Sequence, residues 1–528
     1  MSPAPGVNVN VTAASSSPQN NAPTGNWFVT GVAHGVSGVA VPIYSMADFT
    51  TYFGQIVNGV LTGRYSTTVG GVTIDSSLLY DSLDVYFREG GVVAWVSRMV
   101  PASSGTAAAT SSSAGAFILT AAGVGAWANS SNANASGIIL TITNNNGVYG
   151  ATIALNGNVL AASPGLLTDT EVINWVNSLP VYLSGCTAAA QAHASNLPSN
   201  GNSTAYYFTA GVDAAVADSD MTAALAAFTP NLGAGQVSRP GATSGTTYQN
   251  LTNHAIANNR IAFLDGASQS GSAEATAVTA LTGAVTTLQG AVTDASYAAL
   301  FYPWVIAPGI TNTNPSSTQS LVFQRTVPPS AYAAAKASLS DLGGEANVPA
   351  AGVQASRATY VTGLANASSS GPNFTAASRS SLNAGGVSLL RNVPSANTVA
   401  IYGYRTCAYD PNWQFLAHAR FRMQLVGEFN VVGETYTFRE IDANGQLFGA
   451  FNGDLSAVCL RHYNRGSLYG VTPSAAFTVN TGQSVNTRAT IAAGQINAQV
   501  ALRFSPTSEQ VTINVTKYAA NAALPQTL

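Results

Sequence analysis

The chain has 528 residues, of which 46% are hydrophobic, and this length predicts two to four domains instead of one core. Charged residues make up only 8%, against roughly 25% in a typical soluble domain. The formal net charge is −3, so no overall field attracts nucleic acid or an anionic membrane. We expect neither of them as a direct partner.

Small and polar residues (Ala, Ser, Thr, Asn and Gly) make up for the low share of charged residues. Such a surface is weakly repulsive and easily desolvated, which suits extensive protein–protein contact. The charges that remain are unevenly distributed, because residues 391–528 carry a net +3 and the first 390 residues a net −6. This difference could support complementary contacts between neighbouring copies, or it could be scatter among small numbers.

The chain has three cysteines, Cys186, Cys407 and Cys459, which lie far apart without CxxC spacing. We expect buried reduced thiols, and neither a disulfide framework nor a cysteine-rich metal site. The first residues lack the basic and apolar pattern of a secretory leader, and no apolar run reaches the ~18 residues that a membrane span needs. These features predict assembly in a cytoplasm without membrane insertion.

Residues 1–23 are predicted to form an N-terminal linking arm. Apolar and polar residues alternate in it, which is typical of a strand with one buried face, over Val7, Asn8, Val9, Asn10 and Val11. The polar stretch 15–21 then has the composition of a flexible linker. A strand set off in this way can pair with another chain, which favours a protein that joins copies of itself.

Residues 24–100 are predicted to be the first part of an α/β core. A buried strand is expected over 25–33 and a helix over 46–54. Leu79, Leu83 and Tyr86 recur at helical spacing and predict a longer helix over 76–89. A buried strand over 92–99 completes a strand–helix–strand order, which indicates α/β packing.

Residues 101–204 are predicted to be an inserted β-rich domain. Three strands are expected in it, over 117–120, 137–143 and 149–155. Thr168 and Glu171 have the spacing of a capping box, so a helix is expected to begin there.

Residues 205–390 are predicted to be a central α/β domain. Its expected strands cover 205–210, 260–264 and 302–306. Its expected helices run from Asp220 to Phe228 and from Ser330 to Asp341. A polar, glycine-rich stretch covers residues 362–386.

Residues 391–517 are predicted to be a C-terminal domain, followed by an arm over 518–528. Helices are expected over 413–429 and 455–467, and strands over 497–504 and 510–515. The last of these alternates apolar and polar residues, with Val511, Ile513 and Val515 on one face. This strand could be donated to a neighbour or belong to the subunit's own sheet.

Motifs that carry chemistry are missing from the sequence. It has no Walker A motif, no GxGxxG after a strand, no GxSxG and no HExxH. Asp265 has the best catalytic position, at the end of a buried strand, but it lacks a partner acid, histidine or phosphate loop. Asp218 and Asp220 are interpreted as helix N-terminal groups. We therefore expect a protein that is not an enzyme and has no cofactor or metal.

The order of several short motifs resembles the tail sheath proteins of contractile phage tails. The matching segments extend over most of the chain, and they are Pro5-Gly6-Val7-Asn8-Val9, Ala47-Asp48-Phe49, Gly90-Gly91, Tyr302-Pro303-Trp304, Pro328-Pro329-Ser330, Arg405-Thr406, Asp410-Pro411-Asn412-Trp413 and Gly466-Ser467-Leu468-Tyr469-Gly470. The chain departs from the family pattern at Gln414, where the family usually has arginine, and at residues 417–420.

The resemblance implies an α/β (α+β) core built from N-terminal and C-terminal portions, with a β-rich inserted domain and extended terminal arms. It implies a homo-oligomer of stacked hexameric rings, in a virion tail, that contracts around a tail tube between baseplate and tail terminator proteins. Residues 391–517 are then expected to face the tube. Tube- or neighbour-facing positions are expected at four arginines, Arg420, Arg422, Arg461 and Arg465.

Two alternatives remain from the sequence. One is the sheath of a bacterial contractile injection apparatus, such as a phage-tail-like bacteriocin or a secretion system. The other is a hydrolase-like α/β enzyme, which would need a catalytic cluster that the sequence does not contain.

Overall fold

The fold is taken from a computed structural model of the chain. It describes residues 24–509 and Lys517, together with residues 9–11 and 14–16. The segments within 24–509 that are not described are 58–59, 70, 102, 111–116, 133–135, 192–194, 196, 310–323, 343–344 and 443. No described helix is both long and apolar enough to cross a membrane.

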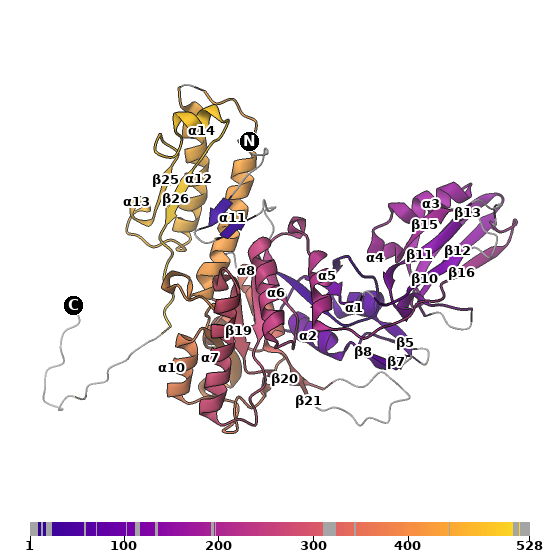
Figure 1. The fold of residues 1–528 in the computed structure, drawn as a ribbon, viewed down its shortest axis with the longest axis horizontal. Helices are drawn as coiled ribbons and strands as arrows, with labels where there is room; N and C mark the ends of the chain where they lie inside the picture. Colours follow the sequence, from indigo (N-terminus) through magenta and orange to yellow (C-terminus); the bar gives the residue numbers. More distant parts are fainter. Residues whose placement is uncertain are drawn as a thin grey trace.

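An eight-stranded sheet forms the centre of the molecule (Figure 1), here called the sheet core. From edge to edge its strands are β24 (Thr398–Ile401), β23 (Val387–Val393), β19 (Ala298–Tyr302), β18 (Ile261–Asp265), β17 (Gly235–Ser238), β3 (Asn26–Gly31), β9 (Ala94–Arg98) and β4 (Val41–Ile43). The six inner strands run parallel, whereas β24 and β4 are antiparallel to their neighbours. The mixed α/β fold is thus as predicted.

Helices cover both faces of this sheet, which explains its nearly continuous apolar strands. In β18, Ile261 and Phe263 belong to one hydrophobic cluster, and Ala262 and Leu264 belong to the other. The first cluster includes residues of α2 (Ser77–Arg88) and α8 (Pro329–Leu342). The second includes residues of α5 (Met221–Ala226), α6 (Gly245–Ala257), α7 (Glu274–Ala291) and α10 (Ala376–Ala384).

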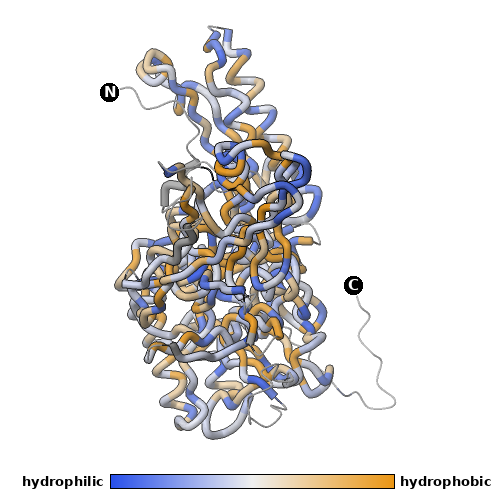
Figure 2. Tube along the Cα trace, turned by 90° about the vertical axis from the view of Figure 1, so that its right-hand side faces the viewer, coloured by the Kyte–Doolittle hydropathy of each residue, from blue (hydrophilic) through white to orange (hydrophobic). Residues whose placement is uncertain are grey.

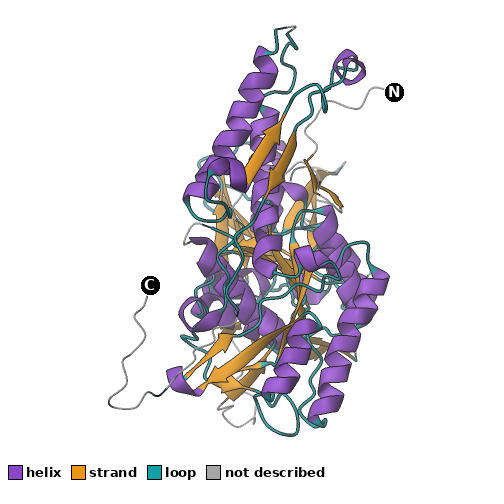
Figure 3. Cartoon of the chain, turned by 90° about the vertical axis from the view of Figure 1, so that its left-hand side faces the viewer, coloured by secondary structure: helices purple, strands orange, loops and turns teal. Residues whose placement is uncertain are grey.

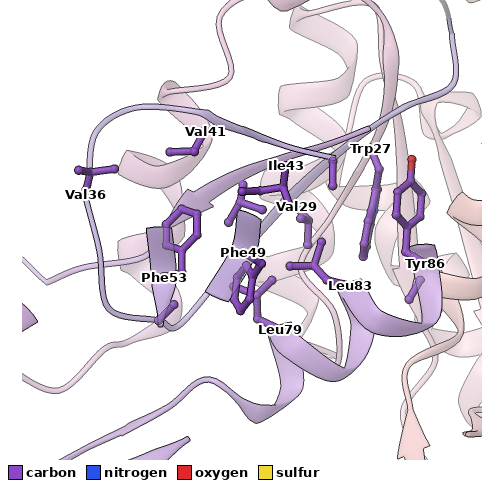
Figure 4. Close-up of a cluster of buried hydrophobic side chains, with 14 of the residues drawn as sticks. Trp27, Val29, Val36, Val41, Ile43, Phe49, Phe53, Leu79, Leu83 and Tyr86 are labelled. Carbon is purple, nitrogen blue, oxygen red and sulfur yellow. The ribbon is translucent and has the colours of Figure 1, made fainter. Parts of the chain in front are cut away.

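Figure 4 shows part of the first cluster beside strands β3 and β4, where Phe49 and Phe53 of α1 (Met46–Phe53) pack beside Leu79 and Leu83 of α2. Ser45 caps α1, because its side chain accepts a hydrogen bond from the Asp48 amide at 3.3 Å. The expected helices over 46–54 and 76–89 are confirmed. Between them lie two hairpins, formed by β5 (Gln55–Val57) with β6 (Val60–Thr62) and by β7 (Ser66–Val69) with β8 (Val72–Asp75).

A lobe formed by residues 103–213, the inserted lobe, extends from the sheet core at the right of Figure 1. One of its sheets contains β10 (Thr106–Thr110), β11 (Phe117–Val124) and β15 (Cys186–Ala190). The other contains β14 (Asn158–Ala162), β13 (Val148–Leu155), β12 (Ile138–Asn145) and β16 (Ser203–Tyr207). Strand β16 ends earlier than the sequence predicts.

Two helices, α3 (Asp169–Ser178) and α4 (Val181–Ser184), complete the inserted lobe. Thr168 caps α3 as predicted, because its side chain accepts from the Glu171 amide at 3.2 Å. At the neck of the lobe, Gly105 and Val212 exchange backbone hydrogen bonds of 2.8 and 3.2 Å. The chain therefore enters and leaves the lobe at one paired position.

The structure corrects the predicted strand over 302–306. Strand β19 ends at Tyr302, and the chain continues as β20 (Val305–Pro308) in a separate sheet with β21 (Gln324–Val327) and β22 (Gly363–Leu364). Pro303 has no amide hydrogen, so it cannot continue the ladder of an inner strand. The polar, glycine-rich stretch 362–386 contains β22 and α10.

The C-terminal lobe, residues 416–505, stands above the sheet core in Figures 1 and 3. Its long helices are α11 (Leu416–Glu434) and α12 (Gln446–Asn464), and its strands are β25 (Phe477–Asn480) and β26 (Gln499–Leu502). Short helices α13 (Pro473–Ala476) and α14 (Arg488–Ala492) lie between them. Helix α12 begins nine residues before its predicted start, and β26 is shorter than predicted.

Candidate assembly surfaces

The strand pair β25–β26 lies against the two long helices of the C-terminal lobe (Figure 3). Val479 and Val500 face each other in the register and contribute to the hydrophobic clusters of this lobe. Figure 2 shows hydrophobic and hydrophilic segments alternating along the helix at the top of the view, as expected for helices that bury one face. No third strand joins the pair among the described residues. We call this strand pair the ribbon.

The hydrogen-bond pattern of the ribbon shows which backbone groups point outward. The Arg503 amide donates to the Ala476 carbonyl at 2.9 Å, one step beyond the Phe477–Leu502 pair. Because hydrogen-bonded and non-hydrogen-bonded pairs alternate in an antiparallel ladder, Val500 and Leu502 direct their amide and carbonyl groups away from β25. Within the described part of the chain, nothing pairs with this outer edge of β26.

The opposite edge of the ribbon is partly covered by helix α12. The side-chain amide of Asn452 donates to the Val479 carbonyl at 2.9 Å. The edge of β26 is therefore the more accessible of the two for a further strand.

The N-terminal strand that the sequence predicts is confirmed in part. Val9–Val11 form β1, which pairs antiparallel with β2 (Ala14–Ser16) of the same chain and lies beside α11. The linker predicted over 15–21 therefore begins inside β2. Val7 and Asn8 lie outside the described residues, as do Val511, Ile513 and Val515, so their predicted role as linking strands stays a prediction.

Arg420 and Arg422, predicted to face the tube or a neighbour, lie inside the subunit. Arg420 is 0% exposed, and its guanidinium donates to Asp341 of α8 at 2.5 Å. Burial lowers the pKa of Arg420, but the charges and hydrogen bonds of Asp341 and Tyr404 together raise it above its ordinary value. Arg420 thus joins α11 to the sheet core, and the prediction for it is wrong.

Arg422 is 3% exposed, and its guanidinium lies over the rings of Tyr297 and Trp413 at 3.9 and 4.5 Å. It donates to the Ser296 hydroxyl at 3.0 Å, with Asp294 3.7 Å away. Burial lowers its pKa. The prediction for Arg422 is also wrong, because its guanidinium packs against aromatic rings near a carboxylate inside the molecule.

Arg461 and Arg465, the other two predicted partner-facing residues, remain accessible. Their side chains are 47% and 50% exposed. Arg461 contacts Glu428 of α11, and Arg465 donates to Glu345 at 2.7 Å. Each side chain is therefore about half exposed, while a glutamate of the same subunit holds its guanidinium.

Asp265, the best catalytic position in the sequence, has a structural role. Its buried carboxylate accepts from the Gly241 amide at 2.9 Å, and from the amide and hydroxyl of Ser330 at 2.7 and 2.8 Å. Burial raises its pKa to about 6, although these hydrogen bonds act in the opposite direction. The carboxylate joins the end of β18 to the first turn of α8.

The remaining candidate groups also serve structural roles. Asp220 accepts from the Ala217 amide at 2.7 Å, and Asp218 pairs with Arg239 at 2.6 Å. The three cysteines are buried and free, as predicted. No group of metal-binding side chains lies within the described residues.

The sequence does not predict a buried cluster around His462. His462 of α12 lies between Glu428 of α11 and Glu345 of the segment that follows α8. These residues are 34 and 117 positions from His462 in the chain. No local spacing in the sequence indicates such a cluster.

The fold of this chain is similar to that of solved sheath proteins. No family model and no curated protein sequence matches the chain, but solved structures do. The sheath tail protein of Listeria innocua gives a TM-score of 0.54 at 12% identity, covering 88% of this chain and 90% of that one.

Two further structures match nearly end to end. The helical sheath of the anti-feeding prophage in its contracted state gives a TM-score of 0.51 at 13% identity, covering 98% of this chain and 99% of that one. The contracted sheath of the extracellular contractile injection system PVC gives 0.50 at 14% identity, with 98% of each chain covered. The resemblance inferred from the sequence is thus confirmed for the fold.

Proposed function

We propose that this protein is the structural subunit of a contractile sheath. Copies stack as hexameric rings in a helix around a tube, and contraction drives the tube through the target envelope. The observation that carries the proposal is the similarity to contracted sheaths over 98% of the chain. A near-neutral surface with 8% charged residues is consistent with this extensive packing.

The linkage between copies is proposed to occur by strand addition at the outer edge of β26. An edge strand with unpaired backbone groups is a template for another chain, and a two-stranded ribbon gains stability from a third strand. The donated strand is Val7–Val11 of a neighbour, or the alternating segment that contains Val511, Ile513 and Val515. Donation of the N-terminal strand requires that β1 leave β2, its partner in the isolated subunit.

The proposed domain organisation follows from the same assembly. Residues 24–102 and 214–390 build the rigid body, the inserted lobe of residues 103–213 is the inserted domain in place of the predicted range 101–204, and 391–517 face the tube. The regions 1–23 and 518–528 are the linking arms. The tube protein then contacts the exposed parts of Arg461 and Arg465, and baseplate and terminator proteins hold the two ends of the polymer.

Contraction is proposed to draw on free energy stored in the extended polymer. A heterologous interface that does not close generates a helical array. Main-chain links through the arms can persist while the rigid bodies rotate and repack. The extended state is then metastable, and its release requires no catalytic group.

Electron microscopy of the purified protein tests this proposal. We expect tubes with six-fold rings when the protein is concentrated. A monodisperse monomer under all conditions would contradict it.

Deletion of residues 1–12 tests the role of the N-terminal arm. We expect folded subunits that no longer form tubes, because the strand donor is gone. The matched variant ends after Thr507 and removes the second candidate donor. Normal tubes from the first variant and none from the second would assign the linking strand to the C-terminal arm instead.

A second candidate is the sheath of a bacterial contractile injection apparatus. The two structures that match nearly end to end are described as an anti-feeding prophage sheath and an extracellular contractile injection system sheath. Electron microscopy of particles from the producing cells separates the two functions. Sheathed tails attached to capsids indicate a phage, and sheathed particles without capsids indicate an injection apparatus.

A further inference from the structure

His462 has a carboxylate at each of its two ring nitrogens. Nδ1 lies 2.9 Å from an oxygen of Glu345, and Nε2 lies 2.7 Å from an oxygen of Glu428. The side chain is 0% exposed, and the Phe421 ring packs against it at 5.0 Å. A neutral imidazole has one N–H and would turn a lone pair toward one carboxylate, whereas an imidazolium donates to both. The site therefore fits the charged ring.

The two carboxylates belong to parts of the molecule that are distant in the sequence. Glu345 follows α8 of the sheet core, whereas Glu428 and His462 lie on α11 and α12 of the C-terminal lobe. Glu345 also accepts from Ser467 at 3.0 Å, and the neighbouring Ala346 amide donates to Gln424 of α11 at 3.1 Å. His462 is thus at the centre of a polar junction between the core and the lobe.

The charges that face the ring come from every element around it. They are Glu345 from the segment after α8 and Glu428 from α11, which are paired in turn with Arg465 just after α12 and Arg461 of α12. The thiol of Cys459 is buried close to Glu428, and burial raises its pKa to about 12, so it stays neutral. With a charged ring, three cations surround two carboxylates. With a neutral ring, the two arginines alone balance them.

The directions of the pKa shifts agree with this geometry. Burial lowers the pKa of His462, and the hydrogen bonds and charges of Glu345 and Glu428 raise it above its ordinary value of 6.5. Burial raises the pKa of each glutamate, and hydrogen bonds led by that from His462 lower it below 4.5.

We propose that His462 is a protonation-dependent link that tightens the attachment of the C-terminal lobe to the sheet core while the ring is charged and loosens it when the ring loses its proton. This inference concerns the isolated subunit and goes beyond the proposed sheath function. In a polymer whose subunits repack during contraction, it makes the freedom of the lobe depend on pH.

The pH window follows from the direction of each shift. A raised histidine pKa adds stability that is fully present below 6.5 and is lost as pH rises through the native pKa. The lowered glutamate pKa values add stability that is present above 4.5 and is lost as pH falls through the native values. The link is therefore strongest from about pH 4.5 to 6.5, and it weakens above that range.

Hydrogen exchange of the monomeric subunit between pH 5 and 9 tests the link. The probe is the Ala346 amide, corrected for its intrinsic rate. As pH rises, we expect the equilibrium constant for opening of this amide to increase by about tenfold for each unit by which the native His462 pKa exceeds 6.5. His462→Gln should abolish this pH step, because glutamine does not titrate. His418→Gln, in α11 but without a carboxylate partner, should keep it.

A persistent pH step in His462→Gln would overturn the proposal. If that variant does not fold, nitrogen-15 NMR of the histidine rings in the unmodified protein decides the matter. With five histidines in the chain, the signals can be assigned by comparison with single substitutions at the other four. A His462 ring that titrates at or below pH 6.5 contradicts the link. Neither measurement depends on tube formation, so failure of the sheath function would be seen separately by electron microscopy.

Discussion

The sheet core and the C-terminal lobe satisfy their backbone groups in different ways. In the core, six parallel strands are covered on both faces, and antiparallel strands β4 and β24 pair with the outermost of them. Glu89 of the core, for example, has its partner within the same body, because Lys336 contacts it at 2.6 Å. The lobe has two strands and an edge at Val500 and Leu502 that nothing described pairs with.

This contrast separates folding from assembly. The core contains interactions that a single subunit completes, so changes there should act on stability. The ribbon contains interactions that a single subunit leaves incomplete, so changes there should act on polymer formation. Four substitutions test this division, in order of decreasing expected effect on the free energy of unfolding.

Glu89→Ala should have the largest effect, a loss of about 3–5 kcal/mol of unfolding free energy, because one partner of a buried pair is removed. The carboxylate also accepts from the amides of Thr359, Tyr360 and Val361, which would lose their acceptor. Urea denaturation measures the change. Lys336→Met is the matched control and should cost less, since it leaves those amides bonded. Equal losses would mean that the backbone contacts contribute little.

Arg420→Ala tests the join between lobe and core. We expect a loss of about 3 kcal/mol, because Asp341 would remain buried without its cation. The control Arg461→Ala removes a half-exposed arginine and should cost under about 1 kcal/mol. Thermal unfolding of both variants gives the comparison. If Arg420→Ala folds with unchanged stability and fails only to bind a tube, the assignment of Arg420 to the interior is wrong.

Ser244→Ala should cost about 1 kcal/mol, because this residue caps α6 of the core and accepts from the Thr247 amide at 3.2 Å. The matched variant in the lobe is Thr487→Ala, the cap of the short helix α14. We expect its effect on global unfolding to be smaller, because fraying of α14 leaves the core intact. A larger effect from Thr487→Ala would show that the lobe and the core unfold together.

Val500→Pro should have the smallest effect on folding and the largest on assembly. The Val500 amide points away from β25, so proline removes no bond of the ribbon, and edge strands accept proline at such positions. We expect the unfolding free energy to change by under about 1 kcal/mol, because proline has as many side-chain carbons as valine for the half-buried contacts of this position, and we expect no tubes in electron micrographs. Ala501→Pro is the control, because it removes a bond inside the ribbon and should destabilise the lobe. Normal tubes from Val500→Pro would exclude the edge of β26 as the acceptor.

The sequence predicted those elements whose apolar residues recur at a fixed spacing. Helix α2 was located within one residue because Leu79, Leu83 and Tyr86 mark its buried face. Helix α7 is not predicted, although Ala277, Leu281, Val285 and Leu288 form its buried face, because alanine, threonine and glycine make up most of the rest of the helix. The first half of α12 was missed because Gly449 and Gly453 lower its helix propensity.

The candidate site was predictable only where it depends on local pattern. Alternation located β1, but it does not reveal that β1 pairs with β2. The charge of the four arginines favours a partner-facing role, whereas the burial of Arg420 and Arg422 depends on Asp341 and Tyr297, which are far away in the chain. The same holds for His462, whose partner Glu345 is 117 positions away. Contacts of this kind are set by the tertiary fold.

The paired neck at Gly105 and Val212 gives the inserted lobe the properties of an exchangeable module. Because its two ends hydrogen-bond to each other, a lobe of any size with the same neck can be attached there without stretching the sheet core. An exchanged lobe would also have to replace the contacts that this lobe makes with the core, such as the hydrogen bond from Asn156 to the Gly54 carbonyl and the packing of Tyr182 against Tyr52. A reporter protein whose termini are adjacent could be grafted at the same two residues.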